Sequence, residues 1–258
     1  MAINAKKRFQ YAYLLRLMVV RNIKQKYRRS ILGVLWTVLL PLLEMLVMTI
    51  TFSFAIKDGD LDPRVFIMCG VILFSFHREA TAGSLGSVIG ARGLLDRVYL
   101  PAILFPLANA FSALVNFFFA FLAMLGLTIV IGFPLSLHIF LFTFELPALF
   151  MFSAGIGIAL SALNVYFRDI AHLYGIALML WMYMSAVFIS IENYAGIIMT
   201  VIKINPMYRF INYFRILVAL KEIPPFIDLA ILYGYGILSI ILGILIFKMM
   251  KKNFLAYI

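Results

Sequence analysis

Ionisable side chains inside apolar sequence are the groups in this chain most able to do chemistry. Glu44 lies within the apolar stretch 31–56, and Thr37 and Thr51 lie seven residues before and after it. Seven residues are nearly two helical turns, so the three side chains form one polar stripe on an otherwise apolar helix. Such a stripe faces a cavity or a partner helix rather than lipid. It therefore either lines a path for a polar substrate or makes a structural pair, and the sequence leaves both readings open.

Further charges lie inside two other apolar stretches. Arg78 and Glu79 occur in the middle of 65–89, and Glu145 occurs early in 139–163. A charge at the centre of a bilayer costs about 3 kcal/mol even on insertion scales, so these groups must face protein or water. Buried ion pairing is one interpretation, and Arg78 has Glu44, Glu79 and Glu145 as candidate partners. A relay in a proton-coupled carrier is the functional alternative.

One face of the stretch 171–191 is rich in aromatic residues. It carries Tyr174, Leu178, Trp181, Ser185 and Phe188 at helical spacing. Aromatic rings offer flat surfaces for sugar rings, but they also fill space within a helix bundle. Trp181 is far from either headgroup region, which favours a lumen for this face, while packing remains the alternative for any one ring.

The motifs of common enzyme sites are absent from the sequence. There is no GxxxxGK[ST] phosphate loop and no HExxH zinc motif, and Cys69 is the single cysteine. The acidic segment "DGDLD" lacks the glycine and the terminal glutamate of a calcium loop, so a solvated turn is the better interpretation. We therefore expect no catalytic residue, no metal site and no cofactor on this chain.

Composition then defines the class of protein. Of the 258 residues, 65% are hydrophobic and only 13% are charged, against about 25% charged in soluble domains. A membrane helix needs about 20 apolar residues. The sequence predicts an all-α integral membrane protein with six transmembrane helices, and a transmembrane domain over 31–247. The six expected spans are 31–56, 65–89, 103–132, 139–163, 171–191 and 227–247.

The net charge of +11 is concentrated at the N-terminus, where residues 1–30 hold nine Lys and Arg and no acid. This segment reads as an amphipathic helix in the membrane interface, because its apolar and basic residues fall on different faces. Attraction to anionic lipid explains the charge, so no nucleic acid is expected as a partner. The bias of Lys and Arg between loops predicts that the N-terminus and the tail 248–258 are both cytoplasmic.

The segment 192–226 fits neither a loop nor a span. It is apolar, yet Lys203, Arg209 and Arg215 interrupt it and Asn205-Pro206 punctuates it. Two short interfacial or re-entrant helices hinged at Asn205 are predicted, since irregular backbone at membrane depth needs protein or water around it. This outer segment is a candidate gate.

Several stretches together resemble one known family. These are "VVRNIKQKYRRSILGVLWTVLLPLL", "ARGLLDRVYLPAILFPLANAFSALVNF", "LSALNVYFRDI", "INPMYRFINYFR" and "KMMKKNFLAYI", in this order along nearly the whole chain. The chain resembles the transmembrane subunit of an ABC-2 type polysaccharide exporter, a family that serves O-antigen, teichoic acid and rhamnose-rich polymers. Asn22, Leu40 and the segment "FSFH" depart from residues frequent in the family, which leaves the polymer open.

The resemblance implies a homodimer with two copies of a separate P-loop ATPase that binds ATP and Mg. The assembly would export an undecaprenyl-pyrophosphate-linked glycan across the cytoplasmic membrane of a prokaryote. It also implies that the first and fifth helices line the conduit. Residues 9–29 and 90–101 would contact the ATPase, through Arg92, Leu94, Asp96, Arg97 and Tyr99 in the second of these segments.

Two further sets of residues take expected roles in this picture. The outer gate would include Asn205, Pro206, Tyr208 and Arg209. The pyrophosphate would meet Arg28 and Arg29, an expectation drawn from their charge and position alone. Three alternatives are an ABC-2 permease for a lipid, drug or peptide, a proton-coupled secondary carrier that uses Glu44, Arg78 and Glu145, and a membrane scaffold that transports nothing.

Overall fold

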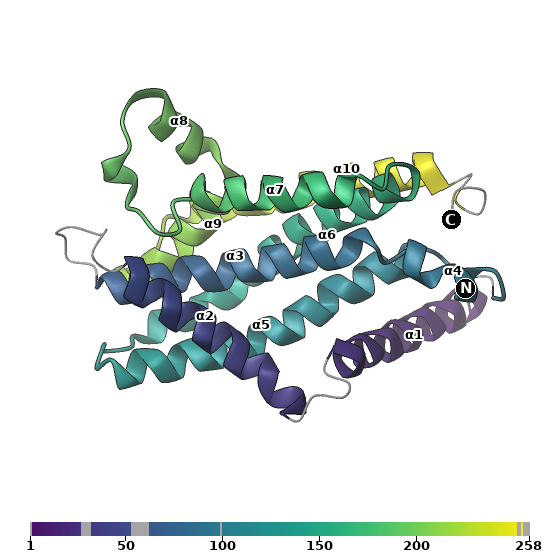
Figure 1. Ribbon diagram of the computed structural model, residues 1–258, viewed down its shortest axis with the longest axis horizontal. Coiled ribbons are helices and arrows are strands. Elements are labelled where there is room, and N and C mark those ends of the chain that lie inside the picture. The colour runs from purple at the N-terminus through teal and green to yellow at the C-terminus, as the bar shows by residue number, and fades with distance from the viewer. Residues whose placement is uncertain (1, 27–31, 53–61, 99, 252–253, 255–258) are drawn as a thin grey trace.

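The computed structural model describes all residues except 1, 27–31, 53–61, 99, 252–253 and 255–258 (Figure 1). Within that part of the chain the secondary structure is helical, without a strand. The longer helices are α1 (Ala2–Lys26), α2 (Trp36–Phe52), α3 (Pro63–Leu85), α5 (Leu104–Val130), α6 (Phe142–Tyr166), α7 (Ile170–Tyr183), α8 (Gly196–Ile204), α9 (Pro206–Arg215) and α10 (Phe226–Met250). The shorter ones are η1 (Gly33–Leu35), η3 (Ile89–Ala91), α4 (Arg92–Leu95), η4 (Leu137–Leu141), η5 (Ile191–Asn193) and the π-helix η6 (Ile216–Leu220).

Four of the described helical segments are long and apolar enough to cross a membrane. They are α3, α5, α10 and the segment Leu137–Tyr166, in which η4 runs directly into α6. All four match spans expected from the sequence. The expected first and fifth spans correspond to α2 and α7, which are apolar but have only 17 and 14 residues. These two helices are shorter than the length of about 20 residues that a span usually needs.

Backbone conformation explains why these two helices are shorter than the apolar sequence. Gly33 has a φ of +49°, so the chain turns before α2 and a regular helix begins only at Trp36. Ala186 has a φ of +50°, which is unfavourable for a residue with a side chain. The helix α7 has ended at Tyr183, and the apolar residues that follow do not extend it.

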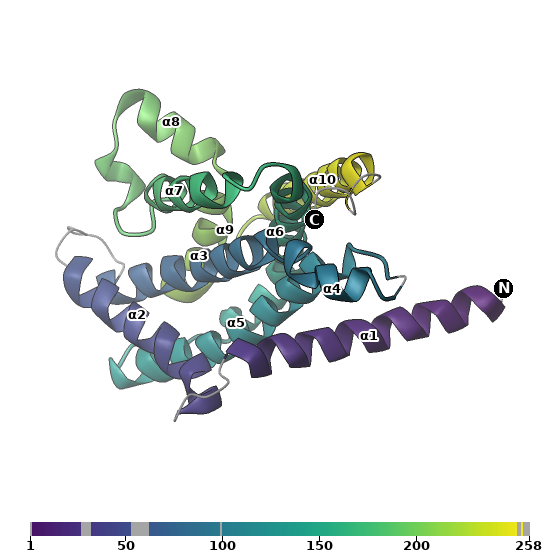
Figure 2. The same cartoon turned by 45° about the vertical axis from the view of Figure 1, so that its right-hand side comes forward.

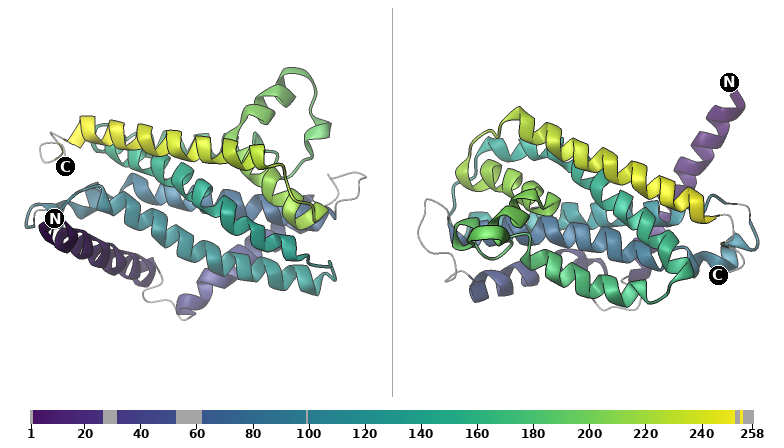
Figure 3. Two further views of the ribbon diagram at one scale, coloured as in Figure 1. Left: turned by 180° about the vertical axis from the view of Figure 1, so that it is seen from behind. Right: turned by 90° about the horizontal axis from the view of Figure 1, so that it is seen from above.

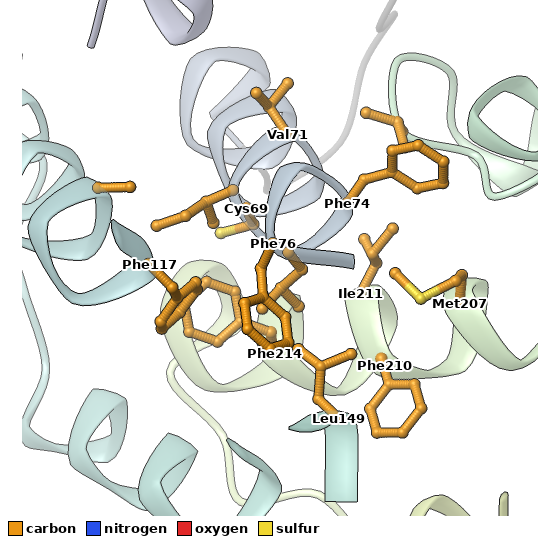
Figure 4. Packing of buried hydrophobic residues seen from close by; sticks show 14 of the residues in the cluster. Cys69, Val71, Phe74, Phe76, Phe117, Leu149, Met207, Phe210, Ile211 and Phe214 are labelled. Atoms are coloured by element: carbon orange, nitrogen blue, oxygen red, sulfur yellow. The ribbon is translucent and has the colours of Figure 1, made fainter. Parts of the chain in front are cut away.

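Helix α3 is the centre of the bundle. It packs against α2, α5, α6, α7 and α9, and most of its residues from Val65 to Phe76 are buried. Figure 4 shows Phe76, Phe117 and Phe214 meeting beside α3, and the rings of Phe76 and Phe117 lie 5.6 Å apart between centroids. This central position means that most side chains along α3 face another helix or a cavity.

Helices α6 and α10 form the most extensive helix pair, and small residues let them approach closely. A Cβ atom at Gly243 would collide with the backbone of Gly155, and one at Gly155 would collide with Ser239. The Ser239 hydroxyl donates a hydrogen bond to the Phe152 carbonyl oxygen at 2.7 Å. Small residues at such crossings are typical of membrane helix packing, as the sequence "SAGIGIALSAL" indicates.

Helix α1 lies along the side of the bundle and extends beyond it at its N-terminal end (Figure 2). Met18 is buried against Leu104, Phe105 and Ala108 at the start of α5. The opposite stripe stays exposed and includes Tyr13, Leu17 and Val20. An exposed apolar stripe on a helix at the edge of the bundle suits the membrane interface expected for it.

The start of α1 and the end of α10 lie at the same end of the bundle, and α9 lies at the opposite end (Figures 1 and 3). Between α7 and α9 the chain forms an arm that carries α8 and stands out from the bundle. The helices α8 and α9 meet at Asn205, where the sequence predicts a hinge.

Candidate functional site

Glu44 and Arg78 form an ion pair between α2 and α3. The Arg78 Nη2 donates to Glu44 Oε1 at 2.6 Å, and the Ser75 hydroxyl donates to Glu44 Oε2 at 3.3 Å. Arg78 also donates to the Ser75 Oγ at 3.3 Å. Of the three partners that the sequence leaves open for Arg78, the structure selects Glu44. Of the polar stripe on α2, Thr37 is buried, Glu44 is partly buried and Thr51 is exposed.

Glu79, the next residue, makes a separate set of contacts on another side of α3. Its Oε1 accepts from Lys26 Nζ at the end of α1 at 2.5 Å and from Asn116 Nδ2 on α5 at 2.6 Å. One carboxylate therefore joins α1, α3 and α5. Four residues before Lys26, Asn22 donates to the Asn109 side chain on α5 at 3.2 Å, which adds a second polar link between α1 and α5.

The two ion pairs line one cavity of about 260 Å³ between α2, α3 and α5. Thr37 contributes a hydroxyl to its wall, and Pro41, Phe76 and Phe117 contribute apolar surface. A cavity with a few converging polar groups on an apolar wall is the usual form of a ligand site. This cavity is the candidate functional site of the chain.

Two more cavities continue this polar lining along α1. One of about 470 Å³ shares Lys26, Glu79 and Asn116 with the first, and one of about 290 Å³ shares Asn22 and Asn109 with the second. The Asn116 Oδ1 is buried without a hydrogen-bond partner among the described residues. A buried amide oxygen in such a wall calls for water or a ligand group.

The aromatic face of α7 lies inside the subunit. Tyr174, Ser185 and Phe188 are buried, and Phe188 stacks on Phe52 at the end of α2 with ring centroids 4.4 Å apart. Trp181 makes edge contacts with His77 on α3 and Phe152 on α6. Of the predicted face, Tyr174, Leu178 and Trp181 lie on α7, whereas Ser185 and Phe188 follow its end at Tyr183, so the five residues do not form one helix face. In this structure they pack against the subunit's own helices. The residues Ile176, Met179, Leu180 and Tyr183 on α7 are exposed instead.

Asn205 holds the hinge between α8 and α9. Its Oδ1 accepts from the Met207 amide at 3.0 Å, which caps α9, and from Trp181 Nε1 at 2.9 Å. Its Nδ2 donates to the Met184 carbonyl oxygen at 2.8 Å and to the Ser185 Oγ at 3.1 Å. Pro206 is the first residue of α9, and Tyr208 and Arg209 lie in its first turn. One side chain thus ties the predicted gate to the end of α7.

Glu145 does not pair with Arg78. It is buried in the first turn of α6, and neither carboxylate oxygen has a hydrogen-bond partner in the part of the chain that the structure describes. The ion pair expected for it is not present there. Burying an unpaired carboxyl group is costly, so its retention needs a reason beyond packing.

The predicted ATPase-contact residues lie on and after the short helix α4. Arg92, Asp96 and Arg97 are exposed, and the Nε of Arg92 lies 3.8 Å from a carboxylate oxygen of Asp96. Leu94 is half-buried. They lie at the same end of the bundle as the two termini (Figure 1). Tyr99, Arg28 and Arg29 fall outside the described residues.

The sequence interpretation missed the amide side chains of the site, and it noted Arg215 only as a cation in apolar sequence, without its burial. Asn22, Asn109 and Asn116 line the cavities described above. For Asn109 and Asn116, a polar residue within an apolar span was the available signal. Arg215 is 3% exposed; its Nε and Nη2 donate to the carbonyl oxygens of Phe66 and Val187. Carbonyl groups rather than an acid satisfy this cation, which charge pairing in the sequence does not reveal.

The fold and the site together define a helical membrane protein with paired charges around internal polar cavities. A family model for ABC-2 type transporters matches residues 13–218, and the chain belongs to this family. This confirms the family expected from the sequence.

Named relatives match most of the chain. A Myxococcus xanthus protein named O-antigen export system permease protein RfbA is 31% identical over 179 residues, which cover 69% of each chain. Two Klebsiella pneumoniae proteins of the same name are 25% and 24% identical, and their alignments cover 96% of this chain and 97% of theirs.

Proposed function

We propose that this chain is the transmembrane subunit of an ATP-driven ABC transporter that exports a lipid-linked polysaccharide across the cytoplasmic membrane. The observation that carries the proposal is the match to the O-antigen export permeases, which covers nearly the full length of both chains. Membership of the ABC-2 family supports a permease that takes its energy from a partner ATPase rather than an enzyme in its own right.

The proposed assembly is a homodimer bound to two copies of a separate ATPase, which holds ATP and Mg. In it, all six apolar helices cross the membrane, including α2 and α7, and both termini are cytoplasmic. The residues of α4 and of the turn that follows it, with α1, form the surface for the ATPase. The substrate is an undecaprenyl-pyrophosphate-linked glycan, of which O-antigen and teichoic acid are the leading classes, with Arg28 and Arg29 at its entry.

Conduit and gate roles follow from where side chains lie. The stripe Thr37, Glu44 and Thr51 on α2 remains the proposed conduit wall, because Thr37 and Glu44 already face a polar cavity. For Trp181 and its neighbours to meet the glycan, α7 must move away from α3 and α6. The contact between Trp181 and Asn205 would transmit that movement to the gate helices α8 and α9.

The alternatives differ in the energy source for transport and in the substrate. A proton-coupled carrier is disfavoured, since the family is one of ATP-driven transporters and Glu44 is already paired with Arg78. A permease for a lipid, drug or peptide would belong to the same family, but the relatives that match along nearly the whole chain are named as O-antigen export permeases.

Deletion of the gene in its native host tests the proposal. The expected result is loss of a surface polysaccharide and accumulation of its lipid-linked form on the cytoplasmic side, both restored by the wild-type gene. The intact complex, extracted gently and weighed, should contain two copies of this chain and two of an ATPase. Unchanged surface glycans with altered export of another compound would move the assignment to the lipid, drug or peptide class.

A further inference from the structure

A fourth cavity lies far from the charged site, at the end of the bundle opposite the termini. It has a volume of about 190 Å³ and is enclosed by α8, α9, η6 and the start of α10. This is far above the roughly 10–15 Å³ that a single water molecule needs. It lies on the proposed gate helices α8 and α9, but the conduit proposed for the polysaccharide does not pass through it.

Two basic side chains and one acidic side chain line the cavity, and their terminal charged atoms have no hydrogen-bond or ion-pair partner among the described residues. Arg209 Nε donates to the carbonyl oxygen of Lys203 at 3.0 Å, which fixes the guanidinium at the cavity wall. The terminal nitrogens of Arg209, the Lys203 ammonium and the Asp228 carboxylate make no hydrogen bond or ion pair within the described residues. Both signs of charge therefore remain available to a ligand.

The floor and rim of the same cavity are apolar. Ile216 and Leu232 line it, and Leu232 is buried. Around it Ile204, Phe226 and Ile227 are strongly exposed. Tyr208 and Tyr213 complete the wall, and tyrosines of this kind mark the level of lipid head groups. Polar groups beside apolar surface are the arrangement that a lipid head group with its acyl chains requires.

The combination of charges selects the head group. Arg and Lys side chains bind phosphate oxygens through strong charge-assisted hydrogen bonds. A carboxylate beside them repels a purely anionic head group but attracts a cation. A primary ammonium offers three N–H donors to a carboxylate, whereas a quaternary ammonium offers none.

We propose that this cavity binds the head group of an aminophospholipid such as phosphatidylethanolamine. Lys203 and Arg209 contact its phosphate, Asp228 accepts from its ammonium group, and the acyl chains lie against the exposed residues of the rim. The site is a lipid-binding site on the outer part of the permease, and its occupancy is separate from transport of the polysaccharide.

Native mass spectrometry of the full chain with added dioleoyl lipids tests the site. The wild type is expected to retain phosphatidylethanolamine roughly tenfold better than phosphatidylcholine or phosphatidylglycerol, as for loss of one charge-assisted contact. Asp228→Asn should abolish the preference over phosphatidylcholine, and Lys203→Gln should weaken retention of both lipids. Glu222→Gln and Lys248→Gln are the matched controls, since neither residue lines the cavity, and should behave as wild type.

Three outcomes would overturn the proposal. They are equal retention of the three lipids by the wild type, a preference for phosphatidylglycerol, and an unchanged preference in Asp228→Asn. The Lys203 side chain makes no hydrogen bond within the described residues, and its carbonyl oxygen, which accepts from Arg209, is kept in Lys203→Gln. Weaker lipid binding in this variant therefore reports loss of the charge rather than loss of a contact within the fold. Addition of undecaprenyl phosphate as competitor separates a site for bulk lipid from one for the carrier, because a carrier site would release phosphatidylethanolamine.

Discussion

The Glu44–Arg78 pair makes the sharpest prediction at the scale of single residues. Both partners keep some exposure, so the pair should contribute less than about 1 kcal/mol to folding. Glu44→Gln is therefore expected to leave the melting temperature nearly unchanged. The same change should lower polysaccharide export several-fold in a deletion strain, because it leaves the Arg78 charge unpaired in the cavity wall.

The reversed pair, Glu44→Arg with Arg78→Glu, separates two roles for these residues. If the pair itself positions α2 on α3, the double variant should recover much of the export that each single variant loses, as in a double-mutant cycle. If Glu44 contacts the substrate directly, the double variant should export no better than the singles. The second result would contradict a positioning role.

Asp62 gives a prediction on pH dependence. It caps α3 by accepting from the Arg64 amide at 2.9 Å. The hydrogen bond from the Arg64 side chain is the main reason that the pKa of Asp62 is lowered. Stabilisation by the carboxylate is thus fully present above its unfolded pKa of about 3.9 and is lost as pH falls through the lower folded pKa. Asp62→Asn keeps a cap but should melt lower at pH 7, and the difference in melting temperature should shrink as pH falls below about 3.9. A difference that stays constant as the pH is lowered would count against this account.

At the scale of helix pairs, α6 and α10 depend on the absence of side chains at their crossing. Gly243→Ala should destabilise the subunit by about 1–3 kcal/mol, because the new Cβ meets the Gly155 backbone. Gly234→Ala on the same helix is the control, since nothing lies within 4 Å of its added Cβ. That change should be neutral or stabilising by about 0.5–1 kcal/mol. Thermal unfolding of the purified variants measures both, and similar melting temperatures would refute the close crossing.

The joint between α7 and the α8–α9 pair depends on Asn205. Asn205→Ala removes the cap of α9, worth about 1 kcal/mol, together with the bonds to Trp181 and Met184. Amide hydrogen exchange should become faster in the first turn of α9 and at the end of α7. Trp181→Phe removes the hydrogen bond to Asn205 and part of the ring packing on His77 and Phe152, but not the bond that caps α9. It should therefore speed exchange near α7 and leave the cap intact. Equal effects of the two variants would argue against a hinge centred on Asn205.

The sequence predicts elements better than it predicts their contacts. Apolar length places α5 and α10 within about three residues of their observed ends, because burial in lipid is a local property of the sequence. It places the start of the first span too early, because α2 begins only after the turn at Gly33, and the end of the fifth too late, because α7 ends at Tyr183. The contact between Lys26 and Glu79 joins residues far apart in the chain, and only the packing of α1 against α5 brings them together.

At the scale of the whole molecule, α2 and α7 carry exposed apolar faces that the proposed homodimer would cover. Leu43, Val47 and Ile50 on α2 and Ile176 and Leu180 on α7 are all exposed. Lipid alone can cover such faces, but the conduit proposed for the glycan needs a second wall. A second copy of the chain, placed against both helices, would supply it by twofold symmetry.

Orientation of the whole molecule in the membrane is testable with the native cysteine in place. Cys69 is fully buried on α3, so a membrane-impermeant maleimide should give no background labelling. Glu222→Cys lies at the α9 end of the bundle and Lys251→Cys follows α10 at the other. In spheroplasts the first should label directly, and the second only after permeabilisation, because the bias of basic residues predicts cytoplasmic termini. The reverse pattern in export-competent variants would invert the orientation, and with it the side on which the ATPase must bind.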